Sequence, residues 1–80
     1  MKIPRDISGT DLIKSLRKLG YEFSRQVGSH VRITTNQKGQ HHVTVPKHDP
    51  IKVGTLNSII SDVSEHFDLS KEETIKILFG

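Results

Sequence analysis

The chain has 80 residues, a net charge of +3 and no cysteine. A chain of this length supports one hydrophobic core, so we expect a single domain over residues 1–80. The lack of cysteine excludes disulfides and thiolate metal sites and suits a reducing compartment. No apolar run exceeds three residues. We therefore expect no membrane span and no signal peptide, and a soluble, cytoplasmic protein.

Charge is distributed unevenly along the chain. Residues 1–54 carry ten Lys and Arg and four Asp and Glu, a balance of +6, whereas residues 55–80 carry two and five, a balance of −3. A basic body attracts polyanions and acidic protein partners alike and speeds encounter with either. A protein with scattered lysines has a similar balance, so charge alone does not identify the partner.

The first expected element is a helix after Ser8. Ser8 is a favourable N-cap, and Asp11 is placed three positions later as its capping-box partner. Gly20 supplies the stop at the other end of the helix. Between them, apolar residues recur at helical spacing, namely Leu12, Ile13, Leu16 and Leu19.

A β-hairpin is expected over residues 30–34 and 41–45, joined by a loop at residues 36–40. A loop of this length pairs apolar residues across the strands. The pairs are Val31 with Val45 and Ile33 with Val43. His30 and Arg32 then lie on the opposite face.

An earlier strand is expected over residues 21–27, because apolar and polar residues alternate and predict a half-buried face. The apolar members are Tyr21, Phe23 and Val27. A two-residue turn at Gly28–Ser29 would mix core and solvent positions between this strand and the next. A three-residue turn or a β-bulge corrects this, and Gly28 is the natural place for it. Either choice puts His30 beside the turn.

Two helices close the chain. After Pro46 and Pro50 a helix is expected to begin near Gly54–Thr55. Its apolar stripe consists of Leu56, Ile59, Ile60, Val63 and Phe67. Ser70 and Glu73 form a second capping box, which opens a short terminal helix. The order α-β-β-β-α with a short extra C-terminal helix predicts a two-layer α+β fold that resembles a double-stranded-RNA-binding domain.

Five histidines make metal binding the first function to weigh. His41 and His42 are neighbours in a strand, so their side chains point to opposite faces and do not share one ion. His42 also lies on the order of 13 Å along the strands from the level of His30. We therefore expect no metal site, and we interpret His41, His42 and His66 as solvated surface residues.

His30 is the main candidate for chemistry on RNA. RNA carries its own nucleophile, the 2′-hydroxyl, and an imidazole can take its proton or donate one to the leaving 5′ oxygen. Arg32 on the same face and Arg25 on the neighbouring strand are candidate donors to the phosphate. The same residue types also suit a merely solvated face. A Ser29–His30 dyad is disfavoured, because adjacent side chains diverge in an extended chain and no third residue orients the imidazole.

Further candidate phosphate contacts precede the second long helix. Lys47 and Lys52 flank its Pro-rich approach, and Gly54–Thr55 would place free backbone N–H groups at its start, a natural anion site. An ordinary helix start capped by Thr55 explains the same residues equally well. His48 either contacts substrate or pins the loop, and we favour the loop.

Four segments together resemble one known family. They are Gly9-x-x-Leu12-Ile13-Lys14-x-Leu16-x-Lys18-x-Gly20-Tyr21, Arg25-Gln26-x-Gly28-Ser29-His30, Val43-Thr44-Val45-Pro46-x-His48 and Gly54-Thr55-Leu56-x-Ser58-Ile59-Ile60. With this order and spacing over residues 8–63, the chain resembles the HicA (YcfA-type) toxins of bacteria and archaea.

The resemblance implies an RNA endoribonuclease, an mRNA interferase that inhibits translation as the toxin of a type II toxin–antitoxin pair. It implies cleavage without a metal or other cofactor, and it matches His30 to the family's catalytic histidine. The expected partners are mRNA and a HicB-like antitoxin that covers the site. The candidate RNA and phosphate contacts are Arg25, Ser29, Arg32, Lys47, His48, Lys52 and Thr55.

Residues 65–80 extend beyond the family core and either add to the hydrophobic core or contact the antitoxin. Two alternatives to an active nuclease stay open at this point. One is an RNA-binding module without catalysis that uses the same basic face. The other is a degenerate toxin retained for antitoxin binding.

Overall fold

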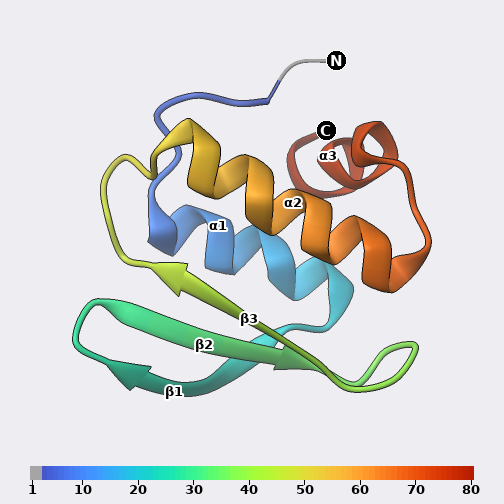
Figure 1. Cartoon of the computed structure of the whole chain (residues 1–80), viewed down its shortest axis with the longest axis horizontal. Coiled ribbons are helices and arrows are strands. Elements are labelled where there is room, and N and C mark those ends of the chain that lie inside the picture. Colours follow the sequence, from blue (N-terminus) through green and yellow to red (C-terminus); the bar gives the residue numbers. More distant parts are fainter. Residues whose placement is uncertain (1–2) are drawn as a thin grey trace.

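In the computed structural model, which describes residues 3–80, helices lie on one face of a three-stranded antiparallel sheet (Figure 1). The elements are α1 (Gly9–Leu16), the short 3₁₀ turn η1 (Arg17–Leu19), β1 (Glu22–Val27), β2 (His30–Thr35), β3 (His41–Pro46), α2 (Val53–Phe67) and α3 (Lys71–Phe79). The expected α+β fold, with its α-β-β-β-α order and extra C-terminal helix, is confirmed.

Both ends of the first helical segment follow from the sequence. The Ser8 hydroxyl accepts a hydrogen bond from the Asp11 backbone N–H at 3.1 Å, which caps α1. Gly20 ends the following 3₁₀ turn with a φ of +83°, a left-handed conformation that glycine adopts without strain. The side chains on the inward face of this segment are buried, namely Leu12, Leu16 and Leu19.

The hydrophobic core lies between the helices and strands β2 and β3. Val31 pairs with Val45 and Ile33 pairs with Val43, as the loop length predicted. All four side chains are buried. The apolar stripe of α2 packs onto them, since Leu56, Ile59, Ile60, Val63 and Phe67 are buried as well.

Strand β1 differs from the expectation of a half-buried strand. Phe23 and Val27 are 63% and 67% exposed, and all six residues of the strand are exposed. β1 is an edge strand and the one farthest from the helices in Figure 1, so the helix layer covers only β2 and β3. Tyr21, which precedes β1, is fully buried.

The β-bulge also lies elsewhere than expected. Val27 pairs with His30, so Gly28–Ser29 form a two-residue turn, and the register shifts between Phe23 and Arg25 instead. Ser24 is therefore the extra residue, and its hydroxyl is hydrogen-bonded to the Thr34 hydroxyl. The pairing of β1 with β2 does contain a bulge, as one of the two expected alternatives, but its placement at Gly28 was wrong.

Helix α2 begins slightly earlier than expected. Lys52 is its N-cap residue and makes no side-chain capping bond, and Val53 is the first helical residue. Thr55 is the third helical residue, so its interpretation as the cap was wrong. None of the helices that the structure describes is both long and apolar enough to cross a bilayer.

The C-terminal helix joins the same core. Ser70 and Glu73 form the expected capping box, with reciprocal bonds of 3.0 and 2.9 Å that also lower the pKa of Glu73. Leu78 of α3 is buried in the core cluster, and the Lys18 ammonium group donates to its backbone carbonyl at 3.1 Å. Residues beyond α2 thus contribute apolar area to a small core.

Candidate active site

A shallow pocket of about 200 Å³ lies on the face of the sheet that carries no helices. We call this face the open face. The pocket is lined by Arg25, Val27, His30, Arg32 and Thr44, so all three strands contribute. The candidate catalytic histidine and both candidate arginines are therefore brought together.

Strand register explains why these side chains meet. Arg25 lies opposite Arg32, and Arg32 lies opposite Thr44 on its other side. Cross-strand partners share a face, and Phe23 shares the helix-covered face with its partner Ile33. Without the extra residue at Ser24, Arg25 would lie two positions after Phe23 on that same face. The bulge thus directs Arg25 to the open face.

The pocket is electropositive. Arg25 and Arg32 lie directly opposite each other across the ladder, an arrangement of like charges that costs stability. Within residues 3–80 neither guanidinium pairs with a carboxylate, and no Asp or Glu lines the pocket. A bound phosphate would neutralise both charges and form bidentate hydrogen bonds with them.

His30 begins β2 at the mouth of this pocket. Its side chain is exposed and makes no hydrogen bond to any other group in the part of the chain that the structure describes. Both ring nitrogens are therefore accessible to a substrate. A proton-transfer group requires such access.

His48 lies beside His30, with 6.4 Å between the ring centroids. The loop that carries it is held by its backbone, because the Lys47 N–H donates to the Ser29 carbonyl and the Gly9 N–H donates to the His48 carbonyl. Backbone groups therefore hold the loop, and the exposed side chain of His48 is adjacent to His30. The predicted register of the β2–β3 hairpin indicates that His48 lies near His30, because it sets Pro46, two residues before His48, opposite His30.

The remaining candidates are more dispersed. Ser29 and Lys47 are exposed next to His30, in the turn and in the strand-to-helix loop that bond to each other. Lys52 is exposed at the start of α2 and lines neither pocket. Thr55 lines a separate hollow of about 570 Å³ between β3 and α2, and this hollow shares only Thr44 with the pocket at His30.

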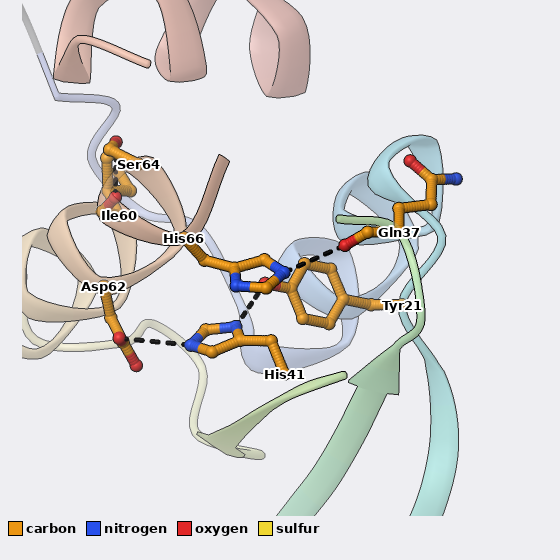
Figure 2. A network of polar contacts seen from close by, with 7 residues as sticks. All are labelled: Tyr21, Gln37, His41, Ile60, Asp62, Ser64 and His66. Carbon is orange, nitrogen blue, oxygen red and sulfur yellow. Dashed lines mark hydrogen bonds and ion pairs between the residues drawn. The ribbon is translucent and has the colours of Figure 1, made fainter. Parts of the chain in front are cut away.

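On the helix-covered face, two other histidines form a network (Figure 2). The Tyr21 hydroxyl is 2.7 Å from Nδ1 of His41, and Nε2 of His41 is 3.2 Å from an Asp62 carboxylate oxygen. The His66 ring stacks on the His41 ring at 4.4 Å and donates from Nε2 to the Gln37 carbonyl at 2.9 Å. The interpretation of His41 and His66 as solvated residues was wrong, because β3 directs His41 toward α2. His42 is exposed, as expected.

The Asp62 carboxylate sets the direction of proton donation in this network. A carboxylate oxygen only accepts, so Nε2–H of His41 donates to Asp62, and Nδ1 of the neutral ring then accepts from the Tyr21 hydroxyl. Burial and the nearby Asp62 carboxylate raise the pKa of Tyr21, so the hydroxyl keeps its proton. Residues 3–80 contain no group of three or more His, Cys, Asp or Glu placed to hold a metal ion.

A family model described as the HicA toxin of bacterial toxin–antitoxin systems matches residues 9–64. The chain belongs to the HicA toxin family. The match begins at the first residue of α1 and ends within α2, so it includes the whole sheet, the pocket and His48. No curated protein and no solved structure gives a significant match to the chain. As a HicA toxin, the protein is the toxin of a toxin–antitoxin pair, and its partner is an antitoxin.

Proposed function

We propose that this HicA toxin is an RNA endoribonuclease, an mRNA interferase that inhibits translation in the cytoplasm. His30 moves a proton during cleavage, and Arg25 and Arg32 stabilise the negative charge that develops on the phosphate. The observation that carries the proposal is the open-face pocket, where an unbonded imidazole lies beside two unpaired arginines. The reaction requires no metal ion, because the RNA 2′-hydroxyl is the nucleophile.

Flanking residues would hold the RNA on either side of the reacting phosphate. Ser29, Lys47 and His48 lie next to His30 through the backbone bonds of the turn and loop. Lys52 and Thr55 are more distant, at the start of α2, where backbone N–H groups attract phosphate. These five residues are the proposed RNA contacts outside the pocket.

The proposed protein partner is a HicB-like antitoxin that covers the open face. An antitoxin that occupies the pocket would exclude RNA and neutralise the two arginines. Residues 1–80 form one toxin domain in this proposal, with a core at residues 8–63 and a helical extension at residues 65–80. The buried hydrogen bond between Ser64 and Thr74 supports a structural role for the extension.

The experiment compares RNA cleavage by the wild type and by His30→Asn in the presence of a metal chelator. We expect the variant to keep its fold and to lose about 10²–10⁴-fold in rate, the range for general acid–base catalysis. His42→Asn is the matched control, because it removes another exposed histidine from the same face. Equal rates for wild type and His30→Asn would rule the assignment out.

An RNA-binding role without catalysis is the second candidate, and the open basic face favours it as well. Labelled RNA separates the two. The nuclease produces shorter fragments, and one 2′-deoxy substitution at the cleaved position blocks it. The binding module produces a shifted but intact band. A degenerate toxin retained for antitoxin binding would do neither and would leave host growth unaffected.

A further inference from the structure

Cleavage of RNA by its own 2′-hydroxyl involves two proton transfers. One group takes the proton from the 2′-oxygen, and another gives a proton to the leaving 5′-oxygen. His30 supplies one of them in the proposed function. The pocket at His30 holds no carboxylate, and the guanidinium groups that line it are hydrogen-bond donors without an acceptor site.

The other four histidines differ in whether their rings are already bonded within the protein. His41 and His66 are bonded on the helix-covered face. His42 is on the open face, but its Nδ1 is bonded to the Thr34 hydroxyl at 2.7 Å. His48 resembles His30: its side chain is exposed and has no hydrogen-bond partner anywhere in residues 3–80.

The position of His48 relative to His30 is fixed by backbone contacts. The Lys47 N–H bonds to the Ser29 carbonyl at 2.7 Å, which ties the residue before His48 to the residue before His30. The Gly9 N–H bonds to the His48 carbonyl at 2.9 Å. A Cβ on Gly9 would lie 2.1 Å from the Pro46 carbonyl oxygen, so the absence of a side chain permits this close approach.

The two rings are spaced for a shared ligand and not for contact with each other. Their centroids are 6.4 Å apart and their planes are inclined by 59°, so the rings do not stack. A phosphate group between them needs one hydrogen bond of about 2.6–3.2 Å to each ring. Both side chains are exposed, so each ring can rotate to meet such a group.

We infer that His48 is the second proton-transfer group, acting with His30 on one phosphodiester; this rests on the proposed function. One imidazole takes the 2′-hydroxyl proton as the bond from O2′ to phosphorus forms. The bond from phosphorus to O5′ breaks, and the other imidazolium gives its proton to O5′. The products are a 2′,3′-cyclic phosphate and a 5′-hydroxyl, and no water or metal is consumed.

The first test is the pH dependence of kcat/KM for RNA cleavage by wild type, His48→Asn and His48→Gln. Two proton-transfer groups give the wild type a bell-shaped profile. We expect each His48 variant to lose at least about 10²-fold in rate and one limb of the bell. His42→Asn is the control and keeps both limbs. A wild-type profile without two limbs, or a His48 variant that keeps both, overturns the inference.

The second test uses RNA in which sulfur replaces the leaving 5′-oxygen at the cleaved position. A thiol has a pKa of about 8.5 and leaves without a general acid. We expect this substrate to restore either His30→Asn or His48→Asn to within about tenfold of wild type, and so to identify the acid. If it restores neither, the inference is wrong.

The outcomes also separate this inference from the proposed function. If the wild type does not cleave RNA, or if His30→Asn cleaves as fast as wild type, the proposed function fails. If the wild type cleaves RNA and His30→Asn is slower, while His48→Asn keeps a two-limbed profile, only the role of His48 fails. Circular dichroism of each variant verifies that the fold is kept.

Discussion

On the helix-covered face of the sheet, His41 has a partner at each ring nitrogen and a second imidazole stacked against it. On the open face, the rings of His30 and His48 have no hydrogen-bond partner within residues 3–80. The same strands position histidines on both faces. His41 is the first residue of β3, and Pro46, the last residue of β3, pairs with His30. Residue type therefore says little about role here, whereas the hydrogen bonds of the ring nitrogens separate the histidines bonded within the protein from those that we propose to be reactive.

Histidines on the two faces also differ in how much their removal is expected to lower the free energy of unfolding. Removing His41 leaves the buried Tyr21 hydroxyl without its acceptor, and an unsatisfied buried polar group costs about 1–3 kcal/mol. Removing the His30 side chain leaves no protein group unsatisfied among the described residues. Stability and activity are thus expected to depend on different histidines.

The largest predicted effect is the loss of RNA cleavage when the two arginines of the open face are removed. We expect Arg25→Ala with Arg32→Ala to lower RNA cleavage by at least about 10²-fold, because charge on the phosphate loses its donors. The free energy of unfolding should stay constant or rise by about 0.2–1 kcal/mol, because two like charges no longer face each other.

Urea unfolding and a cleavage assay on the same preparations measure both quantities. Arg17→Ala is the matched control, since it removes an exposed arginine from the helical side. A double variant that is clearly destabilised, or that cleaves as well as the control, would break the contrast between the faces.

A smaller effect concerns the helix-covered face at high pH. Burial raises the pKa of Tyr21 above its ordinary value. The folded state therefore keeps this proton at pH values where the unfolded state, with a pKa of about 10, has lost it. The free energy of unfolding should fall by about 1.4 kcal/mol per pH unit above pH 10, and be unaffected by this group below it.

The chain has a single tyrosine, so tyrosinate absorbance follows this group directly. We expect ionisation to coincide with alkaline unfolding, and Tyr21→Phe to flatten the dependence measured by circular dichroism. Tyrosinate formation near pH 10 in the folded protein would show that the hydroxyl is not held in the network.

Much of the fold follows from local patterns. The capping bonds at Ser8 and Ser70 depend on residues three positions apart, and the β2–β3 register follows from loop length and apolar pairing. These signals are read within a few residues of the chain. The start of α2 was misplaced by one or two residues, because Lys52 caps it without a side-chain bond.

The errors concern contacts between distant segments. Alternation predicts both Phe23 and Val27 as core residues. It cannot show that the helices stop short of β1, which leaves Phe23 exposed, or that the bulge at Ser24 turns Val27 to the open face. The bulge at Ser24 and the position of His41 under α2 likewise depend on packing. At the site, the alternation of β2 predicts that His30 and Arg32 share a face. The bulge at Ser24, which the sequence did not predict, is what puts Arg25 on that face as well.

The central claim, that histidines on the two faces have separable roles, is tested most directly by His30→Asn and His41→Asn measured in parallel. Each variant is assayed for RNA cleavage per folded molecule and for free energy of unfolding. We predict that His30→Asn loses cleavage and keeps its stability, while His41→Asn loses about 1–3 kcal/mol and keeps cleavage. The reverse pattern, or equal losses of both quantities in the two variants, would contradict the account.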